Sequence, residues 1–356
     1  MKLFKSLLVA PATLGLLAPM AATANEVTIS DFAPAEQLAI TNSRVDGLEA
    51  RMNNFEAGGF SDTTSASFSA DFVIGSVDGA GGNAERVTAG YSYQIDLSTS
   101  FTGQDSFDVS IDAGNETFTQ LDLNSGGDTL TIDGIAYTFP LGDKTTVFVG
   151  SDMDGSTLYS TACVYGGVTD NLDDCGNGSS AMNTGSGTAA GASFDIGNGF
   201  TAAIGYTGNG ETGLMTASGD DVYGAQLAYS SDSYGLSATY ADSEVGVDAT
   251  YWGLNGYWTP AETGTAVPSI SVGYEFGNPE TGDNTKQWFV GLQWDEVGPG
   301  VLGAAIGTVG TSETNKMYEG FYSFPVNDSV TVTPIVYIQE DTTNDTGVIL
   351  KTSFKF

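Results

Sequence analysis

The sequence contains no histidine and few basic residues. Among its 356 residues, 10 Lys and Arg stand against 44 Asp and Glu. Without histidine, a Ser-His-Asp triad, a Cys-His pair and a His-ligated metal site are impossible, so we expect no enzyme, no metal and no cofactor. A net charge of −34 excludes nucleic-acid binding, which depends on clustered Lys and Arg. The expected partners are cations, neutral solutes and lipids.

Long apolar runs are absent after the first 24 residues, where no stretch approaches the roughly 20 apolar residues of a spanning helix. The start itself predicts a secretory signal peptide, with a basic Met1–Lys5, an apolar Leu7–Leu17 and a small-residue cleavage site at Ala22–Ala24. Cleavage after Ala24 removes two lysines and leaves 356 − 24 = 332 residues with 8 basic and 44 acidic side chains. The mature chain is then either secreted and soluble or held in a membrane without helices.

Cysteine is equally scarce. Cys163 and Cys175 are the only two, and they lie in a long stretch rich in Gly, Asp, Ser and Asn. In an exported chain such a pair indicates a disulfide, which stabilises by about 3 kcal/mol in the chain-entropy estimate. Metal binding is the alternative interpretation, and two thiols without histidine argue against it.

Residues 25–60 have a helical periodicity. Apolar residues recur at spacings of three and four, as in the seam of a short coiled coil. Two and a half heptads do not hold together unaided, so the helix needs a packing surface or an oligomer formed elsewhere. An amphipathic helix lying against its own domain is the open alternative. The seam residues are Leu38, Thr41, Val45, Leu48, Met52 and Phe55.

From about residue 62 the periodicity changes to two. We count about 16 segments of 8–13 residues in which apolar and polar side chains alternate, separated by turns such as Gly197-Asn198-Gly199. No helical pattern interrupts them. The clearest segments are 87–97, 107–111, 223–229, 234–240, 288–294 and 348–356.

The apolar faces separate a membrane barrel from a soluble β-sandwich. Aromatic residues gather at segment ends, which fits the two aromatic girdles of a transmembrane barrel. The examples are Tyr91/Tyr93, Trp252/Tyr257/Trp258, Trp288/Trp294 and Phe354/Phe356. The opposite faces carry Asp, Ser, Thr and Gln, which suits water, whereas a sandwich would line its core with aliphatic residues from both sheets. We therefore predict an all-β fold, a transmembrane antiparallel barrel of about 16 strands.

The last nine residues, Val348–Phe356, alternate and end on an aromatic side chain. Bacterial outer-membrane barrels characteristically finish this way, with the last strand serving the insertion machinery. Phe354 and Phe356 are the candidate barrel-assembly signal.

The ordered segments resemble the cyanobacterial outer-membrane porins, which are related to the OprB-type carbohydrate-selective porins and often called iron-uptake porins. The similarity spans most of residues 36–356. The matching segments are Asp96–Gly103, Asp112–Asn115, Tyr137–Lys144, Tyr251–Trp258, Pro268–Ser271, Trp288–Trp294, Tyr318–Tyr322, Val330–Pro334 and Leu350–Phe356.

The resemblance implies a trimeric 16-stranded barrel in the outer membrane that passes small hydrophilic solutes. The expected organisation is a signal peptide (1–24), a periplasmic linker with the short coiled coil (25–60) and a porin barrel (61–356). Val45, Leu48, Met52 and Phe55 would lie along the trimer axis. Family members usually carry an S-layer-homology domain before the coiled coil. Only about 12 residues separate the signal peptide from the heptads here, so we expect that domain to be absent, and the sequence leaves peptidoglycan tethering open.

About 38 residues without clear periodicity separate residue 150 from the strand near Ala189. A loop this long is normally functional or disordered. By resemblance to porins we expect it to fold into the lumen and narrow it, with the disulfide as a staple; an acidic flap outside the barrel is the alternative. Carboxylates at a constriction favour cations by Coulomb attraction. Its acidic residues are Asp152, Asp154, Asp170, Asp173 and Asp174.

Polar strand positions supply a second candidate lining, assigned by counting in twos from the neighbouring apolar residues. Arg86 would oppose the carboxylates across the pore, or it is instead a turn residue in contact with lipid headgroups. The expected lumen-facing residues are Arg86, Asp96, Asp108, Asp112 and Asp122.

These features favour a passive, cation-preferring outer-membrane channel for small hydrophilic solutes and ions, with carbohydrate or iron uptake implied by the resemblance. An outer-membrane enzyme is disfavoured because the barrel enzymes we know rely on histidine. A structural or adhesive envelope protein, anchored by the barrel and acting through its helix, is the alternative.

Overall fold

The structure is a computed structural model that describes residues 63–79, 86–115, 118–123, 127–173, 175, 185–211, 213–216, 219–261, 266–310, 312–341 and 344–356. These residues belong to one compact unit, Ala57–Phe356. The expected signal peptide and coiled-coil helix, with Val45, Leu48, Met52 and Phe55, lie outside the described residues. Asp174 of the long loop does too.

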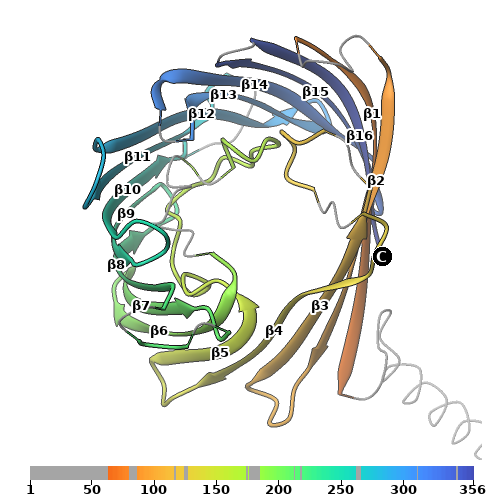
Figure 1. Ribbon diagram of the computed structural model, residues 1–356. Coiled ribbons are helices and arrows are strands. Elements are labelled where there is room, and N and C mark those ends of the chain that lie inside the picture. Colours follow the sequence, from red (N-terminus) through yellow and green to blue (C-terminus); the bar gives the residue numbers. More distant parts are fainter. Residues whose placement is uncertain are drawn as a thin grey trace, which may run out of the picture. The chain divides into compact units, whose positions relative to one another are not determined.

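Sixteen antiparallel strands form a closed barrel, as the sequence predicts. Each strand pairs with its neighbours in the chain, and the last strand closes on the first (Figure 1). The strands are β1 Thr64–Asp78, β2 Thr88–Thr99, β3 Ser106–Gly114, β4 Thr131–Pro140, β5 Thr145–Met153, β6 Gly187–Gly197, β7 Phe200–Gly208, β8 Asp221–Ser230, β9 Tyr234–Ser243, β10 Ala249–Trp258, β11 Ser269–Pro279, β12 Thr285–Val297, β13 Gly300–Val309, β14 Ser312–Asn327, β15 Val330–Glu340 and β16 Asp345–Lys355.

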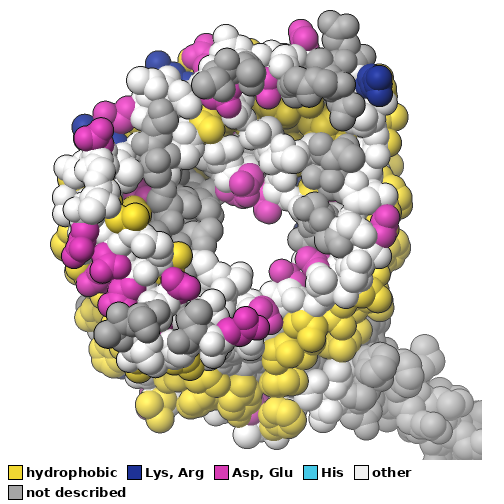
Figure 2. All heavy atoms as spheres, in the orientation of Figure 1, with side chains coloured by type: hydrophobic (Ala, Val, Ile, Leu, Met, Phe, Trp, Pro, Cys, Tyr) yellow, Lys and Arg dark blue, Asp and Glu magenta, His cyan; other side chains and the backbone are white. Residues whose placement is uncertain are grey.

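Apolar side chains face outward because the register sets apolar residues opposite one another on one face. Phe72 pairs with Tyr91 between β1 and β2, and Leu254 pairs with Tyr274 between β10 and β11. A slip of one residue would turn this whole face inward. Leu254 is 52% exposed, and Figure 2 shows a belt of hydrophobic side chains around the outside of the ring. Such a surface suits lipid tails.

Aromatic residues mark both ends of the outward face. On β10, Trp258 is the last residue and Trp252 lies six residues earlier, nearer the other end of the strand, and the two share one face. The ring of Trp252 lies 5.0 Å from that of Tyr240, tilted by 56°, towards one end, and the ring of Tyr229 lies 5.4 Å from that of Tyr234 at the other. Two girdles of this kind are typical of membrane barrels, and the two tryptophans lie as the sequence predicts. Tyr257 does not, because it is adjacent to Trp258 in the strand and therefore lies on the opposite face.

The two ends of the barrel differ in their connections. At one end, here the short-turn end, two to three residues join β6 to β7, β8 to β9, β12 to β13 and β14 to β15. Gly197, Asn198 and Gly199 form the first of these turns with φ values of 100°, 54° and 84°, which glycine and asparagine tolerate. The opposite, long-loop end carries the connections 115–130, 154–186 and 209–220.

The C-terminal strand completes the ring. Phe68 and Phe356 exchange backbone hydrogen bonds of 3.2 and 2.9 Å, and the ring of Phe354 meets that of Phe72 edge to face at 5.8 Å. Closure removes the free strand edges on which sheets aggregate. The role of Phe354 and Phe356 in barrel assembly stays a prediction. Among the described residues, no helix has the length and apolarity to cross a membrane.

A pair of neighbouring substitutions tests which face meets lipid. Ile95 and Gln94 are adjacent near the middle of β2 and point to opposite faces. We expect Ile95→Arg to lower the free energy of unfolding in lipid by about 2–4 kcal/mol, the usual cost of a cation at the midplane. Gln94→Arg, the matched control beside Asp96, should leave it nearly unchanged. Equal effects in denaturant titrations of the two variants would contradict the assignment of faces.

Candidate functional site

The long connection between β5 and β6 lies inside the barrel. Its described residues, 154–173 and 175, follow the inner wall across β7 to β14 (Figure 1). Its backbone amides donate to inward side chains along this path. The donors and acceptors are Gly155 N to Thr207 Oγ1 (2.7 Å), Ser160 N to Gln226 Oε1 (2.6 Å), Val164 N and Tyr165 N to Ser271 Oγ (3.0 and 3.1 Å), and Gly166 N to Gln293 Oε1 (2.9 Å). We call this segment the inward loop.

Glu319 of β14 is the strongest anchor of the inward loop. Its side chain is only 5% exposed, and its carboxylate accepts hydrogen bonds from Tyr165 Oη (2.6 Å), Val168 N (3.3 Å), Thr169 N (3.0 Å) and Thr169 Oγ1. A buried carboxylate is tolerated when its oxygens are hydrogen-bonded in this way. Burial, together with the charge of Glu319, raises the pKa of the Tyr165 hydroxyl, so Tyr165 remains a donor.

The disulfide between Cys163 and Cys175 closes the anchored part of the loop. This confirms the pairing expected from the sequence. The bridge encloses Tyr165 and Thr169, and the backbone oxygen of the fully buried Cys175 accepts from Asn255 Nδ2 of β10 at 2.9 Å. The cross-link therefore holds together two stretches of loop that are each bonded to the wall.

Part of the wall beneath the inward loop, on β12 to β16, is apolar, although the sequence predicts polar inward faces there. Phe289, Met317, Ile335, Tyr337 and Ile349 point inward from β12 to β16 and are buried. The loop residues Val168 and Leu172 belong to the same hydrophobic cluster. These side chains are compatible with an inward position because the loop, rather than water, covers them.

A second connection, 115–130 between β3 and β4, meets the inward loop. Leu121 forms an isolated β-bridge with Thr169, and Asp170 N donates to the backbone oxygen of Gln120 at 3.1 Å. Asn171 Nδ2 also donates to Gln120 Oε1 at 3.2 Å, and Phe118 and Leu121 join the hydrophobic cluster. The inward loop thus contacts a second loop inside the barrel, which the sequence did not predict.

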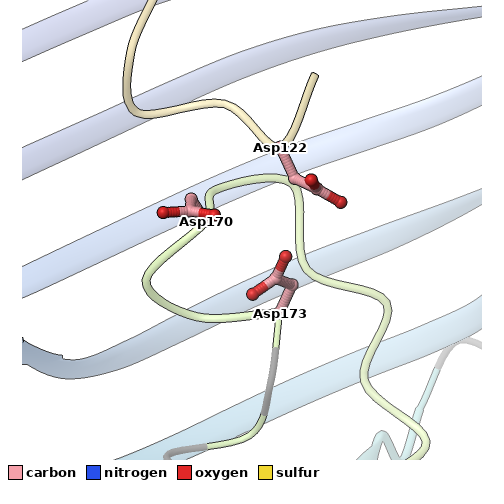
Figure 3. A group of neighbouring side chains, drawn as sticks. All are labelled: Asp122, Asp170 and Asp173. Atoms are coloured by element: carbon pink, nitrogen blue, oxygen red, sulfur yellow. The ribbon is translucent and has the colours of Figure 1, made fainter. Parts of the chain in front are cut away.

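Three carboxylates gather where the two loops meet. The ligand-capable oxygens of Asp122, Asp170 and Asp173 all lie within 4.8 Å of one another (Figure 3). Asp122 comes from the first loop and the other two from the inward loop. Burial, and then the charge of Asp122, raise the pKa of Asp170 above the ordinary aspartate range. Oxygen donors of this kind suit hard cations such as Ca²⁺ or Mg²⁺, although Ca²⁺ takes six to eight of them.

The strands opposite the inward loop also present carboxylates to the lumen. Asp96 of β2 and Asp108 and Asp112 of β3 share the inward face, as the sequence predicts from parity. Ser110 donates to Asp96 at 2.7 Å, Ser106 to Asp108 at 2.6 Å and Thr131 to Asp112 at 2.5 Å. In Figure 2 an open passage runs through the ring with Asp and Glu side chains around it.

Other expected lining residues lie outside the strands or at their ends. Asp122 is in the 115–130 connection rather than on a strand, and Arg86 precedes β2 in the connection after β1, so neither is the strand residue that parity suggested. Asp152 is the exposed penultimate residue of β5, with φ 52°. Asp154 is the first residue of the inward loop, and its carboxylate accepts a hydrogen bond from Ser156 N at 2.7 Å.

The structure adds Asp71 of β1 and Asp133 of β4, which sequence reasoning missed. With Asp122, Ser92 and Gln94 they line a polar recess of about 370 Å³ in the lumen wall. Asp71 lies between the outward Ala70 and Phe72, so the alternation used elsewhere could have found it. Asp133 sits at a register shift in the β3–β4 pairing, where counting in twos fails.

Comparisons with known proteins give the fold and little more. No family model matches the chain. An uncharacterized protein of Nostoc sp. is 36% identical over 105 residues, which are 27% of this chain and only 18% of that protein, so the chain spans less than a fifth of this relative's length.

Among solved structures, a mutant of Rh. blastica porin is 13% identical with a TM-score of 0.58, covering 82% of this chain and 100% of that one. The anion-selective porin from Comamonas acidovorans is 12% identical with a TM-score of 0.60, covering 83% and 99%. The chain has the porin-type barrel fold.

Removing the Glu319 carboxylate tests its role as anchor. In Glu319→Ala four donors lose their acceptor, at a cost of about 1–3 kcal/mol for each donor left buried without a partner. We expect the inward loop to open more often and to be cleaved by added protease at least about tenfold faster. Glu313→Ala changes the same residue type on the same strand and removes an exposed ion pair to Lys286, so it should leave cleavage unchanged. Equal cleavage of the two variants would rule out the anchor.

Proposed function

We propose that this protein is an outer-membrane channel through which small hydrophilic solutes and inorganic ions diffuse passively, with a preference for cations. The observation that carries the proposal is a closed 16-stranded barrel with an apolar outer face and an acidic open passage, narrowed by a loop bonded to its inner wall. In such a channel, passage is governed by the lumen radius and the wall charge, and no catalytic residue is needed.

The charge balance of the lumen supports cation preference. Asp71, Asp96, Asp108, Asp112 and Asp133 line the strand wall, and the cluster of Asp122, Asp170 and Asp173 lies on the loops. Within the described strands, only Lys351 and Lys355 of β16 share the inward face as cations. The Comamonas porin has this fold and is anion-selective, so the sign of selectivity depends on the lumen residues rather than on the fold.

Location and orientation follow from the same proposal. The short-turn end would face the periplasm and the long-loop end the medium, as in outer-membrane barrels generally. Assembly as a homotrimer, and passage of carbohydrate or iron compounds, are the finer parts of the proposal and rest on the resemblance described above. Liposome swelling with sugars of graded size separates a general pore from a sugar-selective one.

Planar-bilayer recording of the refolded protein tests the function. We expect steady conductance steps and a reversal potential that favours K⁺ over Cl⁻ in a salt gradient. A barrel that inserts but carries no current would overturn the channel and favour the anchored structural protein. Current with anion preference would keep the channel and overturn the lumen assignment.

Neutralising the wall should weaken cation preference. At about 4 Å a single charge is worth roughly 1 kcal/mol even in water, so we expect Asp96→Asn with Asp112→Asn to lower the K⁺/Cl⁻ permeability ratio about twofold to fivefold. Asp232→Asn, in the exposed turn between β8 and β9, is the control of equal charge change. A ratio that falls equally in both proteins would show that the wall carboxylates do not set selectivity.

Cation preference should also depend on pH. Because the pKa of Asp170 is raised, its carboxyl takes up a proton before an ordinary aspartate of pKa about 3.9 does, and the cluster loses charge as pH falls through that raised value. Reversal potentials recorded from neutral to acidic pH should begin to lose cation preference above the ordinary aspartate range. Asp170→Asn should reduce this early phase, whereas Asp232→Asn should retain it in full. An early phase of undiminished size in Asp170→Asn would assign it to another group.

A further inference from the structure

Five glycines lie in the barrel wall beneath the inward loop. Gly205, Gly224, Gly273, Gly291 and Gly307 lie on the inward faces of β7, β8, β11, β12 and β13. Four of them stand two residues from a side chain that accepts a loop hydrogen bond, in the pairs Gly205/Thr207, Gly224/Gln226, Gly273/Ser271 and Gly291/Gln293. On each of these four strands a polar side chain binds the loop, and the glycine two residues away leaves space for the loop to lie against the wall. We call the five glycines the loop seat.

The loop occupies the space that side chains would take at the seat. A Cβ at Gly273 would lie 1.4 Å from the backbone oxygen of Cys175, and a Cβ at Gly205 would lie 1.9 Å from that of Gly155. At the other three positions the nearest loop atoms belong to side chains. They are Tyr159 Oη at 2.5 Å from Gly224, Tyr165 Cγ at 2.7 Å from Gly291 and Leu172 Cδ2 at 2.7 Å from Gly307.

Backbone contacts of this kind fix the distance between the loop and the wall. A carbonyl oxygen cannot rotate away as a side-chain tip can, so the loop itself must move if Gly205 or Gly273 gains a methyl group. Reaching an ordinary separation of about 3.5 Å requires roughly 2 Å of displacement at Gly273. The wall lies on one side of the loop and the passage on the other, so this displacement goes into the passage.

We propose that the loop seat determines the solute size that the channel admits, by setting how closely the inward loop lies against the wall. Gly205 and Gly273 are positioning residues in this account, because they act through the loop and need not touch the solute. The inference rests on the proposed channel function. It adds that the width of the passage is encoded in the wall as well as in the loop.

The experiment compares Gly205→Ala and Gly273→Ala with Gly320→Ala, each refolded and checked for heat-modifiable mobility. Gly320 lies on the outward face of β14, where an added Cβ would lie 3.9 Å from the backbone oxygen of Gly303, an ordinary van der Waals separation. Conductance follows pore cross-section, so we expect it to fall roughly twofold in the two seat variants. The largest polyethylene glycol that enters in liposome-swelling assays should become smaller too. Gly320→Ala should match the wild type in both measurements.

A compensating pair keeps the test decisive if the seat variants fold poorly. A Cβ at Gly224 would lie 2.5 Å from the hydroxyl oxygen of Tyr159, and the next nearest atom, a ring carbon of Tyr159, is 3.4 Å away. Gly224→Ala should therefore narrow the channel slightly, and adding Tyr159→Phe should restore the wild-type conductance and exclusion size. A merely destabilising alanine would not be rescued by loss of a hydroxyl on the loop.

The outcomes separate this inference from the proposed function. If the wild-type protein carries no current, both the proposed channel function and the proposed role of the loop seat are contradicted. A conducting wild type whose seat variants equal Gly320→Ala, or conduct more, overturns the seat and leaves the channel standing. Narrowing in Gly205→Ala or Gly273→Ala, or narrowing in Gly224→Ala that Tyr159→Phe reverses, supports the seat.

Discussion

The arrangement of the lumen depends on hydrogen bonds from loop amides to side chains of the barrel wall. A segment without regular structure that enters a closed barrel loses water from its backbone groups, and each buried N–H without an acceptor is costly. The wall supplies these acceptors in order along the loop, from Thr207 through Gln226 and Ser271 to Glu319. Glu319 contributes most because one carboxylate serves four donors, and charged acceptors form the stronger bonds.

This constraint divides the lumen into two unlike halves. Beneath the loop, between β12 and β16, inward residues such as Phe289, Met317 and Ile335 form a dry cluster with Leu172. On the opposite side, β1 to β4 present carboxylates to the lumen. Neighbouring hydroxyl groups donate hydrogen bonds to these carboxylates, and a polar recess lies in this part of the wall. The passage lies between a loop that is held in place and a wall that carries the charge, so its width and its selectivity come from different parts of the molecule.

Much of the barrel was predictable because a strand repeats its chemistry every two residues. The outward faces of β2, β9 and β12 follow directly from alternating apolar residues, and the disulfide follows from two cysteines in an exported chain. The contact between 115–130 and the inward loop was not predictable, because Leu121 and Thr169 meet only after both loops enter the barrel. Glu319 was missed for a related reason, since an acidic residue on an inward face suggests water until the loop that covers it is known. Asp122 was misplaced because counting in twos continued past the end of β3.

Amide hydrogen exchange of the refolded protein in detergent micelles, followed residue by residue, tests most directly whether the loop lies bonded to the inner wall. The structure predicts that the amides of Tyr165, Val168 and Thr169 exchange as slowly as those of the neighbouring strands, because their acceptors are Ser271 and the buried Glu319. Exchange of these three amides at the rate of an exposed connection would contradict the account.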